Sequence, residues 1–223
     1  MKRIVSPILL IIIALSVYAQ KRNKIDIGPF AGASYYLGDL NLSRHFYPPL
    51  PALGVIVKWP VNSRYAIRGN VTYGLLSAAD ADFNNPYQIT RGYSMSTSVT
   101  ELSTLVEFNY LPYIEGSDVE YYSPYLTAGI TWFYSPKMSI PVQPAFPFGI
   151  GFKYNINPKL NVSLEWTFRR TFSDDLDGLS GMKIENLRTR QTAYFYNKDW
   201  YSYAGLSVTY KIRLWKGKCY GLE

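Results

Sequence analysis

Few residues of this chain have types and spacings that could do chemistry. His45 is the only histidine, and Ser43 lies two positions before it. A histidine beside a hydroxyl could act as a general base in a hydrolytic enzyme, because imidazole takes up and releases a proton near neutral pH. No partner acid is apparent near His45 in the sequence, so the sequence favours a solvent-facing loop histidine over a catalytic one.

A second candidate is the acidic segment 173–177, with the sequence Ser-Asp-Asp-Leu-Asp. Its carboxylates could offer oxygens to calcium, but the segment lacks the glycine and the terminal glutamate of a calcium-binding loop. The favoured interpretation is a solvated acidic loop. Glycine-rich phosphate loops, zinc-ligand spacings and nucleophile elbows are absent from the sequence. We therefore predict no enzyme activity, cofactor, metal or small-molecule substrate.

The single cysteine, Cys219, lies near the C-terminal end of the sequence. It cannot form an internal disulfide, and in an oxidising compartment a lone cysteine favours an intermolecular disulfide or a free thiol. Lys216 and Lys218 beside it would favour the thiolate form. We therefore predict that these three residues contact a partner protein.

Nine charged residues alternate with apolar residues along extended segments. They are Asp26, Lys58, Arg68, Glu101, Glu107, Lys153, Glu165, Arg169 and Lys211. In the clearest segment, 160–169, apolar residues occupy the even positions and polar residues the odd ones. This period of two gives a β-strand one apolar and one polar face. Because the nine charges comprise four acids and five bases, we predict that they neutralise one another in an ionic network on the polar face.

The alternation occurs eight times, in segments of strand length. The segments are about 25–36, 52–59, 65–76, 99–110, 124–134, 146–154, 160–169 and 200–213. Rows of aromatic residues on the apolar faces, behind an export signal, indicate that these faces point to lipid and the polar faces into a barrel. A charge facing lipid would cost about 2–4 kcal/mol, so the parity of the nine charges supports this orientation. The sequence predicts an all-β fold, an eight-stranded antiparallel transmembrane outer-membrane β-barrel.

The lengths of the connections fit the same fold. Outer-membrane barrels have short periplasmic turns and longer external loops, so the odd-numbered connections should be long. These are 37–51, 77–98, 135–145 and 172–199. The even connections 60–64 and 155–159 are tight, but 111–123 is longer than expected. Since an eight-stranded barrel is just wide enough for side chains to fill it, we predict a packed interior rather than a pore.

Residues 1–19 have the pattern of a secretory signal, with two basic residues before an apolar stretch and Val17-Tyr18-Ala19 at the cleavage site. We predict one mature domain, the barrel over 20–215, followed by a periplasmic tail over 216–223, with both termini in the periplasm. The net charge is +7, and 21 basic and 16 acidic residues remain without the signal. The basic residues are spread along the strands and near the two ends of the chain, which argues against nucleic-acid binding.

Several stretches resemble a known family. The segment 27–41 ends in Gly-Asp-Leu-Asn, and 149–177 contains Glu-x-x-x-Arg-Arg-Thr-Phe-x-Asp-x-Leu-Asp. Together with 122–130, 197–210 and the late Cys219, they resemble PorG-like proteins, the small outer-membrane barrel component of the type IX secretion system in Bacteroidetes. The likeness covers most of the mature chain.

This resemblance implies a non-catalytic anchor in the bacterial outer membrane, in contact with its lipids. It would bind a periplasmic ring built from a PorK-like lipoprotein and a PorN-like subunit, while cargo crosses through a separate, larger translocon. Contact with the ring would come from the C-terminal tail, where Cys219 could form a disulfide, and from the connection 111–123. The candidate aromatic anchors in that connection are Tyr113, Tyr121 and Tyr122.

Two other functions stay open on the sequence. One is an enzyme at the outer rim that modifies lipid or peptide, with His45 as its base. The other is a general adhesion or envelope-stability barrel that uses the loops 77–98 and 172–199.

Overall fold

The computed structural model describes residues 24–41, 44–84, 86–114, 117–173, 175–177 and 198–213. The expected signal peptide 1–19 and C-terminal tail 216–223 lie outside these residues. The predicted partner-binding residues Lys216, Lys218 and Cys219 therefore lie outside them as well, as does Ser43.

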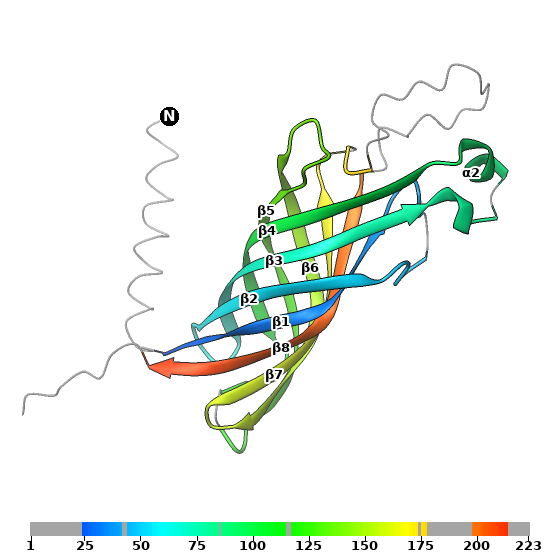
Figure 1. The fold of residues 1–223 in the computed structure, drawn as a ribbon. Coiled ribbons are helices and arrows are strands. Elements are labelled where there is room, and N and C mark those ends of the chain that lie inside the picture. The colour runs from blue at the N-terminus through cyan, green and yellow to red at the C-terminus, as the bar shows by residue number, and fades with distance from the viewer. Residues whose placement is uncertain are drawn as a thin grey trace, which may run out of the picture.

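Eight antiparallel strands form a closed barrel (Figure 1). The strands are β1 (Lys24–Leu37), β2 (Leu50–Pro60), β3 (Tyr65–Ala79), β4 (Ser94–Asn109), β5 (Tyr122–Tyr134), β6 (Val142–Asn157), β7 (Leu160–Thr171) and β8 (Trp200–Arg213). Each strand pairs with its neighbours in the sequence, and β1 pairs with β8 to close the barrel. The predicted eight-stranded antiparallel barrel is confirmed. Among the described residues, no helix is long and apolar enough to cross a membrane.

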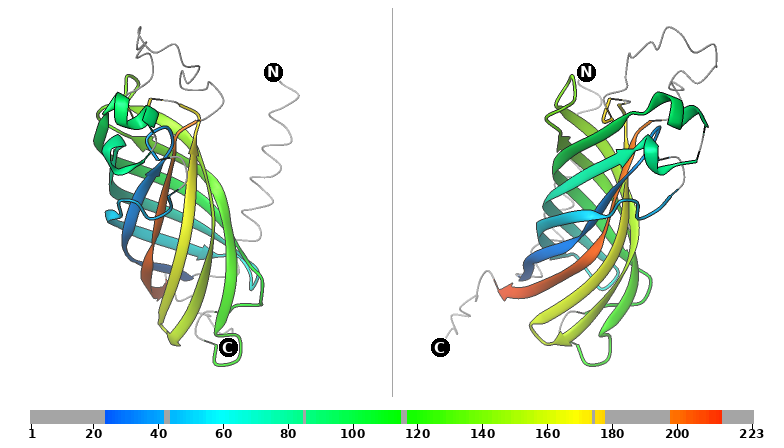
Figure 2. Two further views of the ribbon diagram at one scale, coloured as in Figure 1. Left: turned by 90° about the vertical axis from the view of Figure 1, so that its right-hand side faces the viewer. Right: turned by 45° about the vertical axis from the view of Figure 1, so that its right-hand side comes forward.

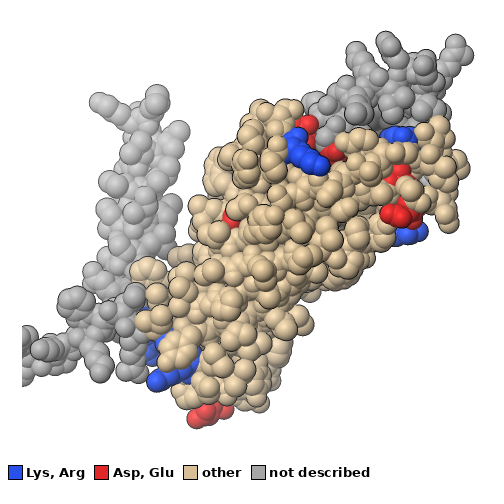
Figure 3. All heavy atoms as spheres, in the orientation of Figure 1, with Lys and Arg blue, Asp and Glu red and all other residues tan. Residues whose placement is uncertain are grey.

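The alternation along the strands gives the barrel an apolar outer wall and a polar interior. Leu53, Leu102 and Ile130 on the outer wall are each more than 60 % exposed, whereas the charged side chains of Arg68 and Glu107 are fully buried inside. In Figure 3 the wall that faces the viewer is largely uncharged, and most charged atoms lie toward the two ends. Such a continuous apolar wall suits contact with lipid rather than water.

The two ends of the barrel differ (Figure 2). One end, which we call the loop end, carries the connections 38–49, 80–93, 135–141 and 172–199, which include the two longest of the barrel. The second of these connections contains a short 3-10 helix, η1 (Asp80–Asp82), and the helix α2 (Pro86–Arg91). The other end, which we call the turn end, carries the connections 61–64, 110–121 and 158–159 and the outer termini of β1 and β8.

The polarity of the strands reverses near the loop end. There the inward-facing residues of β3 and β4 are buried and, apart from Thr97, apolar, while Ser77 and Ser96 face outward. The apolar core of this end includes Leu40, Leu76, Ala78, Met95, Val99, Phe133, Met138 and Leu176. Strand segments that extend past a lipid layer have water outside, so their apolar side chains turn inward. This reversal explains why β4 begins at Ser94, five residues before the segment that the outward-apolar pattern predicted.

Candidate functional site

The barrel interior toward the turn end holds a connected group of ion pairs, which we call the lumen cluster. It consists of Lys58 on β2, Arg68 on β3, Glu107 on β4, Lys153 on β6 and Glu165 on β7. The Glu107 carboxylate is at its centre, 3.4 Å from Lys58 Nζ, 3.2 Å from Arg68 Nη1 and 2.5 Å from Lys153 Nζ. Arg68 Nη1 also lies 2.5 Å from Glu165 Oε2. Five strands are thus joined through charges across the lumen.

A second ion pair lies nearer the loop end. Arg169 on β7 donates to both carboxylate oxygens of Glu101 on β4, over 3.1 and 2.8 Å. The Tyr201 hydroxyl donates to the same carboxylate over 3.0 Å. The sequence predicted one network of nine charged residues. The structure arranges seven of them in two separate groups, the lumen cluster and the pair of Arg169 with Glu101.

Asp26 and Lys211 complete the nine. Asp26 is buried on β1 and accepts a hydrogen bond of 3.1 Å from Asn161 Nδ2. Lys211 lies on β8 at the turn end, where Nζ donates to the Pro158 carbonyl over 3.3 Å at an exposed position. Its ammonium group is at the rim and not inside, because β8 reaches the edge of the barrel at this residue and the long side chain extends to the neighbouring turn.

The charged side chains occupy the lumen rather than line an open channel. Those of the lumen cluster are at most 6 % exposed. Within the described part of the barrel, buried polar atoms without a hydrogen-bond partner include Arg68 Nε, Arg68 Nη2 and Asn70 Oδ1. Such atoms are typical sites for ordered internal water. A lumen of this kind holds the strands together and leaves no wide aqueous path for a macromolecule.

The connection 110–121 folds across the turn end and forms the floor of the barrel. Tyr113 N donates to the Ser63 carbonyl over 2.9 Å, and the Ile114 carbonyl accepts a bond of 2.9 Å from Asn155 Nδ2. The Tyr113 side chain is buried, its hydroxyl donates to Asn155 Oδ1, and its ring centroid lies 5.3 Å from Lys153 Nζ. The connection is longer than a tight turn because it must reach across the open end of the lumen.

This floor corrects part of the predicted partner surface. Tyr113 is 4 % exposed, so it cannot serve as an aromatic anchor for another protein. Tyr121 and Tyr122 are 36 % and 40 % exposed, and their rings pack beside Tyr154 and Phe152 on the outer wall. In that position they suit the aromatic girdle that membrane proteins carry at the boundary of lipid and water. The spacing of the three tyrosines in the sequence contained no sign of this difference.

The loop end is closed by a cap built around Tyr36. The Tyr36 hydroxyl lies 3.0 Å from Asp177 Oδ2 and 2.5 Å from Asp199 Oδ1, and all three side chains are buried. The Gly-Asp-Leu-Asn segment turns back beneath it through two backbone hydrogen bonds of 3.0 Å between Gly38 and Asn41. A Cβ atom at Gly38 would overlap the Tyr36 hydroxyl, so the close approach of this turn requires glycine.

The second loop supports the cap from the side. Arg91 donates to both carboxylate oxygens of Asp80, over 2.6 and 2.7 Å, and Gln88 Nε2 donates to the Leu40 carbonyl over 3.1 Å. At the surface, a hydrogen bond with Asp82 raises the pKa of Tyr47 above its usual value. The loops that carry the Gly-Asp-Leu-Asn segment and α2 are therefore joined to each other. Arg91 and Asp80 belong to one connection, whereas the other contacts join segments far apart in the chain and were therefore not apparent from the sequence.

Replacing Tyr36 with phenylalanine tests the cap. The substitution keeps the ring but removes the hydroxyl that contacts Asp177 and Asp199, at an expected cost of about 1–3 kcal/mol in local stability. We expect the loop end to be cleaved several times faster by an added protease, while the urea midpoint of the barrel changes little. Ser96→Ala, which removes an exposed, outward-facing hydroxyl of β4, is the control. Equal cleavage rates for the two variants would contradict the assigned role of Tyr36.

His45 lies against the outer wall of the barrel rather than free in solvent. Its Nδ1 is 3.3 Å from the Tyr35 hydroxyl, and its ring packs edge-on against Trp166 and Phe168. Phe46 beside it stacks on Trp166. The favoured reading of a simple solvent-facing histidine is thus incomplete, because the imidazole remains exposed but belongs to an aromatic surface.

The acidic segment 173–177 is likewise not a simple solvated loop. The Asp177 carboxylate is buried against Tyr36, and Asp175 Oδ2 accepts a bond of 2.6 Å from the Ser139 backbone. Asp174 lies outside the described residues. In the part of the chain that the structure describes, no group of three or more histidine, cysteine, aspartate or glutamate residues could hold a metal ion.

One functional candidate was missed by the sequence reasoning. Arg170 follows Arg169 and therefore has the outward parity of β7, where it is exposed and lies 5.8 Å from the centroid of the Trp200 ring. Among the strand residues whose side chains the structure describes, it is the one charged residue at an outward-facing position. The signal was present in the alternation, which assigns every second residue after Trp166 to the outer wall.

Comparisons with solved structures find other proteins of similar architecture. The attachment invasion locus protein Ail of Yersinia pestis aligns with a TM-score of 0.48 at 11 % identity, covering 85 % of this chain and 98 % of Ail. Neisserial surface protein A aligns with a TM-score of 0.48 at 8 % identity, covering 86 % and 97 %. The N-terminal β-barrel domain of OprF from Pseudomonas aeruginosa gives 0.43 at 13 % identity, covering 86 % and 98 %.

No curated protein matches the sequence. One family profile does match, and it extends over residues 2–222, almost the whole chain. The family is described as Domain of unknown function (DUF6089). The chain belongs to the DUF6089 family.

Proposed function

We propose that this chain is a non-catalytic outer-membrane β-barrel that anchors a periplasmic ring assembly of the type IX secretion system, with its turn end in the periplasm. The observation that carries the proposal is that the lumen is filled with side chains and closed at both ends. It is filled by the lumen cluster and closed by a floor and a cap, so the barrel is suited to hold a partner rather than to conduct cargo. The sequence resemblance to PorG-like proteins supplies the identity of the partner, a ring of PorK-like and PorN-like subunits.

The outer wall supports the membrane location. Its exposed aliphatic and aromatic side chains form a band between the charged ends of the barrel, as Figure 3 shows for one face. The tight turns 61–64 and 158–159 lie at one end and the longest connections, 80–93 and 172–199, at the other, which matches outer-membrane barrels, in which the short turns face the periplasm. The connection 110–121 is the exception.

The turn end supplies a surface on which a periplasmic partner could bind. In the connection 110–121, Val119 is 85 % exposed and Ile114 is 38 % exposed, beside the exposed carboxylate of Asp118. The rest of the connection is tied to the barrel through Tyr113 and Asn155, so these apolar side chains are held on a fixed support. Exposed apolar residues on a rigid support lower the entropy lost on binding. Cys219 in the tail would add a covalent contact if a partner cysteine lies near it.

Co-purification from detergent tests the proposal. The wild-type protein should recover the ring subunits in stoichiometric amounts, and Val119→Glu should lower that recovery at least fivefold because a charge would enter an apolar contact. Ile140→Glu is the matched control, since Ile140 is 63 % exposed in the loop 135–141 at the opposite end. Recovery of a lone barrel from wild-type cells, or equal loss in both variants, would refute the anchoring role.

Cys219 gives a separate prediction. If it is joined to a ring subunit, wild-type cells should show a higher-mass adduct on non-reducing gels, and Cys219→Ser should abolish that band while leaving barrel levels unchanged. Complete alkylation of Cys219 in intact cells, without any adduct, would remove the disulfide from the proposal and leave the contact through the turn end.

A general adhesion barrel is the second candidate. The hairpin of β3 and β4 projects beyond the rest of the barrel and ends in α2 (Figure 1), where Ile89 is 61 % exposed. Deletion of residues 86–91 should then impair attachment of whole cells to a surface and leave secretion intact. The anchoring role predicts instead that Val119→Glu impairs secretion and leaves attachment intact.

A further inference from the structure

A strip of aromatic residues crosses the outer wall at the loop end, and we call it the rim strip. It consists of Tyr35, His45, Phe46, Phe148, Trp166, Phe168, Arg170 and Trp200. The contacts are continuous. The ring of His45 lies 6.0 Å from that of Phe168, Phe168 stacks on Phe148 at 5.9 Å, and Phe148 meets Trp200 edge-on at 5.8 Å.

The loop 38–49 builds one end of this strip. It folds back over the outside of the barrel and buries the Tyr35 side chain, although Tyr35 has the outward parity of β1. The Tyr35 hydroxyl accepts a hydrogen bond of 2.8 Å from Trp166 Nε1. Phe46, with a φ of 59°, adopts a backbone conformation that is rare for a residue other than glycine. With this backbone conformation, the Phe46 ring stacks on Trp166 on the outer wall.

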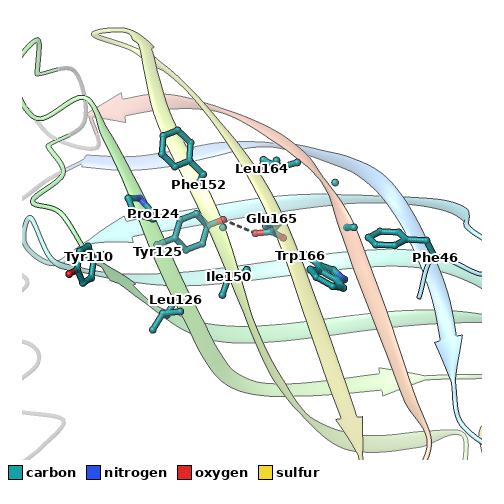
Figure 4. Close-up of a pocket in the computed structure, with 13 residues that line it drawn as sticks. Phe46, Tyr110, Pro124, Tyr125, Leu126, Ile150, Phe152, Leu164, Glu165 and Trp166 are labelled. Carbon is teal, nitrogen blue, oxygen red and sulfur yellow. Dashed lines mark hydrogen bonds between the residues drawn. The ribbon is translucent and has the colours of Figure 1, made fainter. Parts of the chain in front are cut away.

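A groove of about 880 Å³ begins at the rim strip and crosses the outer wall. Phe46 and Trp166 belong to both features, and Figure 4 shows Phe46 and Tyr110 at opposite ends of the groove. Its floor is a row of residues that pair with one another on neighbouring strands from β5 to β8, namely Tyr125, Gly151, Glu165 and Gly205. Its walls are formed by two rows of paired residues, one on each side of the floor. One row is Leu126, Ile150, Trp166 and Ala204, and the other is Pro124, Phe152 and Leu164.

The direction of the groove suits a lipid chain. Tyr110 follows the last residue of β4 at the turn end, whereas Phe46 lies in a connection of the loop end. The groove therefore runs across the wall from the turn end, at Tyr110, to the place where Phe46 stacks on Trp166, and its walls are almost entirely apolar.

Arg170 gives the strip its charge. It is the next outward-facing residue after Phe168 on β7, and its guanidinium lies 5.8 Å from the centroid of the Trp200 ring, at the end of the strip nearest the loop end. A guanidinium facing lipid costs about 2–4 kcal/mol at the bilayer midplane and little near the boundary, where phosphate groups lie. A phosphate beside Arg170 would turn an exposed cation on an apolar wall into a charge-assisted hydrogen-bond donor.

We propose that the rim strip and the groove bind one phosphorylated glycolipid of the outer leaflet, with its phosphate at Arg170 beside Trp200 and an acyl chain in the groove. This inference rests on the orientation in the proposed function, which places the loop end at the outer leaflet. It does not depend on the periplasmic ring. The charge of Arg170 matches an anionic headgroup, and the groove that continues from the strip matches the chain attached to that headgroup.

Native mass spectrometry of the purified, delipidated barrel tests this proposal, with bis-phosphorylated lipid A as the probe. Wild-type protein should bind one molecule. Arg170→Gln should weaken binding about tenfold, the effect of losing one charge-assisted contact, while Arg170→Lys should retain most of it. Ala204→Phe should also weaken binding, because the new ring would fill the groove.

Two matched controls keep the result specific. Lys137→Gln removes an exposed cation of the loop end outside the strip, and Thr104→Phe adds a ring to the outer wall of β4 outside both the groove and the strip. Both should bind like wild type. Equal binding of dephosphorylated lipid A, equal competition by phosphatidylglycerol, or equal loss in Arg170→Gln and Lys137→Gln would overturn the proposal. The anchoring role is read separately from recovery of ring subunits, so either can fail alone.

Discussion

Replacing Glu107 with glutamine is expected to destabilise the folded barrel by about 3–5 kcal/mol, the usual cost of removing one partner from a buried ion pair. Glu107 is the carboxylate that contacts Lys58, Arg68 and Lys153 together. Without its charge, these three cations face one remaining carboxylate, that of Glu165, which bonds to Arg68. Repulsion among desolvated cations would then add to the lost attraction.

Urea unfolding of the protein refolded in lipid vesicles measures this effect. The midpoint for Glu107→Gln should fall well below that of wild type, whereas Asp118→Asn, at an exposed carboxylate of the turn end, should leave it unchanged. A second substitution, Lys153→Met, should restore part of the stability in the Glu107→Gln background, because it removes one of the uncompensated cations. A midpoint that does not move in Glu107→Gln would show that the cluster is not a source of stability.

Replacing Gly28 with alanine is expected to cost about 3 kcal/mol, at the upper end of the usual effect of overpacking. Gly28 lies on β1 at the seam with β8, and an added Cβ would overlap the backbone carbonyl oxygen of Val208. Backbone of a neighbouring strand cannot move aside as a flexible side chain can. The seam would have to separate locally, and this is the contact that closes the barrel.

Gly69→Ala is the matched control, because the nearest atom to a Cβ there is 4.0 Å away. Folding is read from the faster migration of unheated barrel on a denaturing gel, together with the urea midpoint. We expect Gly28→Ala to fold with lower yield and a lower midpoint, and Gly69→Ala to behave like wild type. Equal midpoints for the two variants would mean that the seam relaxes without cost.

Much of the barrel could be predicted because lipid makes the alternation strict. Each of the eight predicted segments overlaps an observed strand, and the interior position of Arg68, Glu107, Lys153 and Glu165 follows from parity alone. The position of a residue in the alternation does not say with which charged side chain it forms an ion pair. The division into the lumen cluster and the pair of Arg169 with Glu101 depends on how strands face each other across the lumen.

The period of two describes the strands within lipid, but it does not describe the connections or the strand segments that extend past the lipid layer. Tyr113 lies in a connection but is buried in the floor, and β4 continues past the band with its apolar residues turned inward. Arg170 was overlooked because it follows an inward arginine, yet its parity places it on the outer wall.

The amino-acid sequence by itself determined the number of strands, their facing and the charged character of the interior, because these follow from a local period of two between lipid and lumen. Only the tertiary structure decided how the barrel is closed. Tyr36 meets Asp177 and Asp199, and Tyr113 meets Asn155, across separations of 42 to 163 residues. Such contacts arise from the closure of the barrel, which brings distant connections over the same opening, and no local pattern in the chain encodes them.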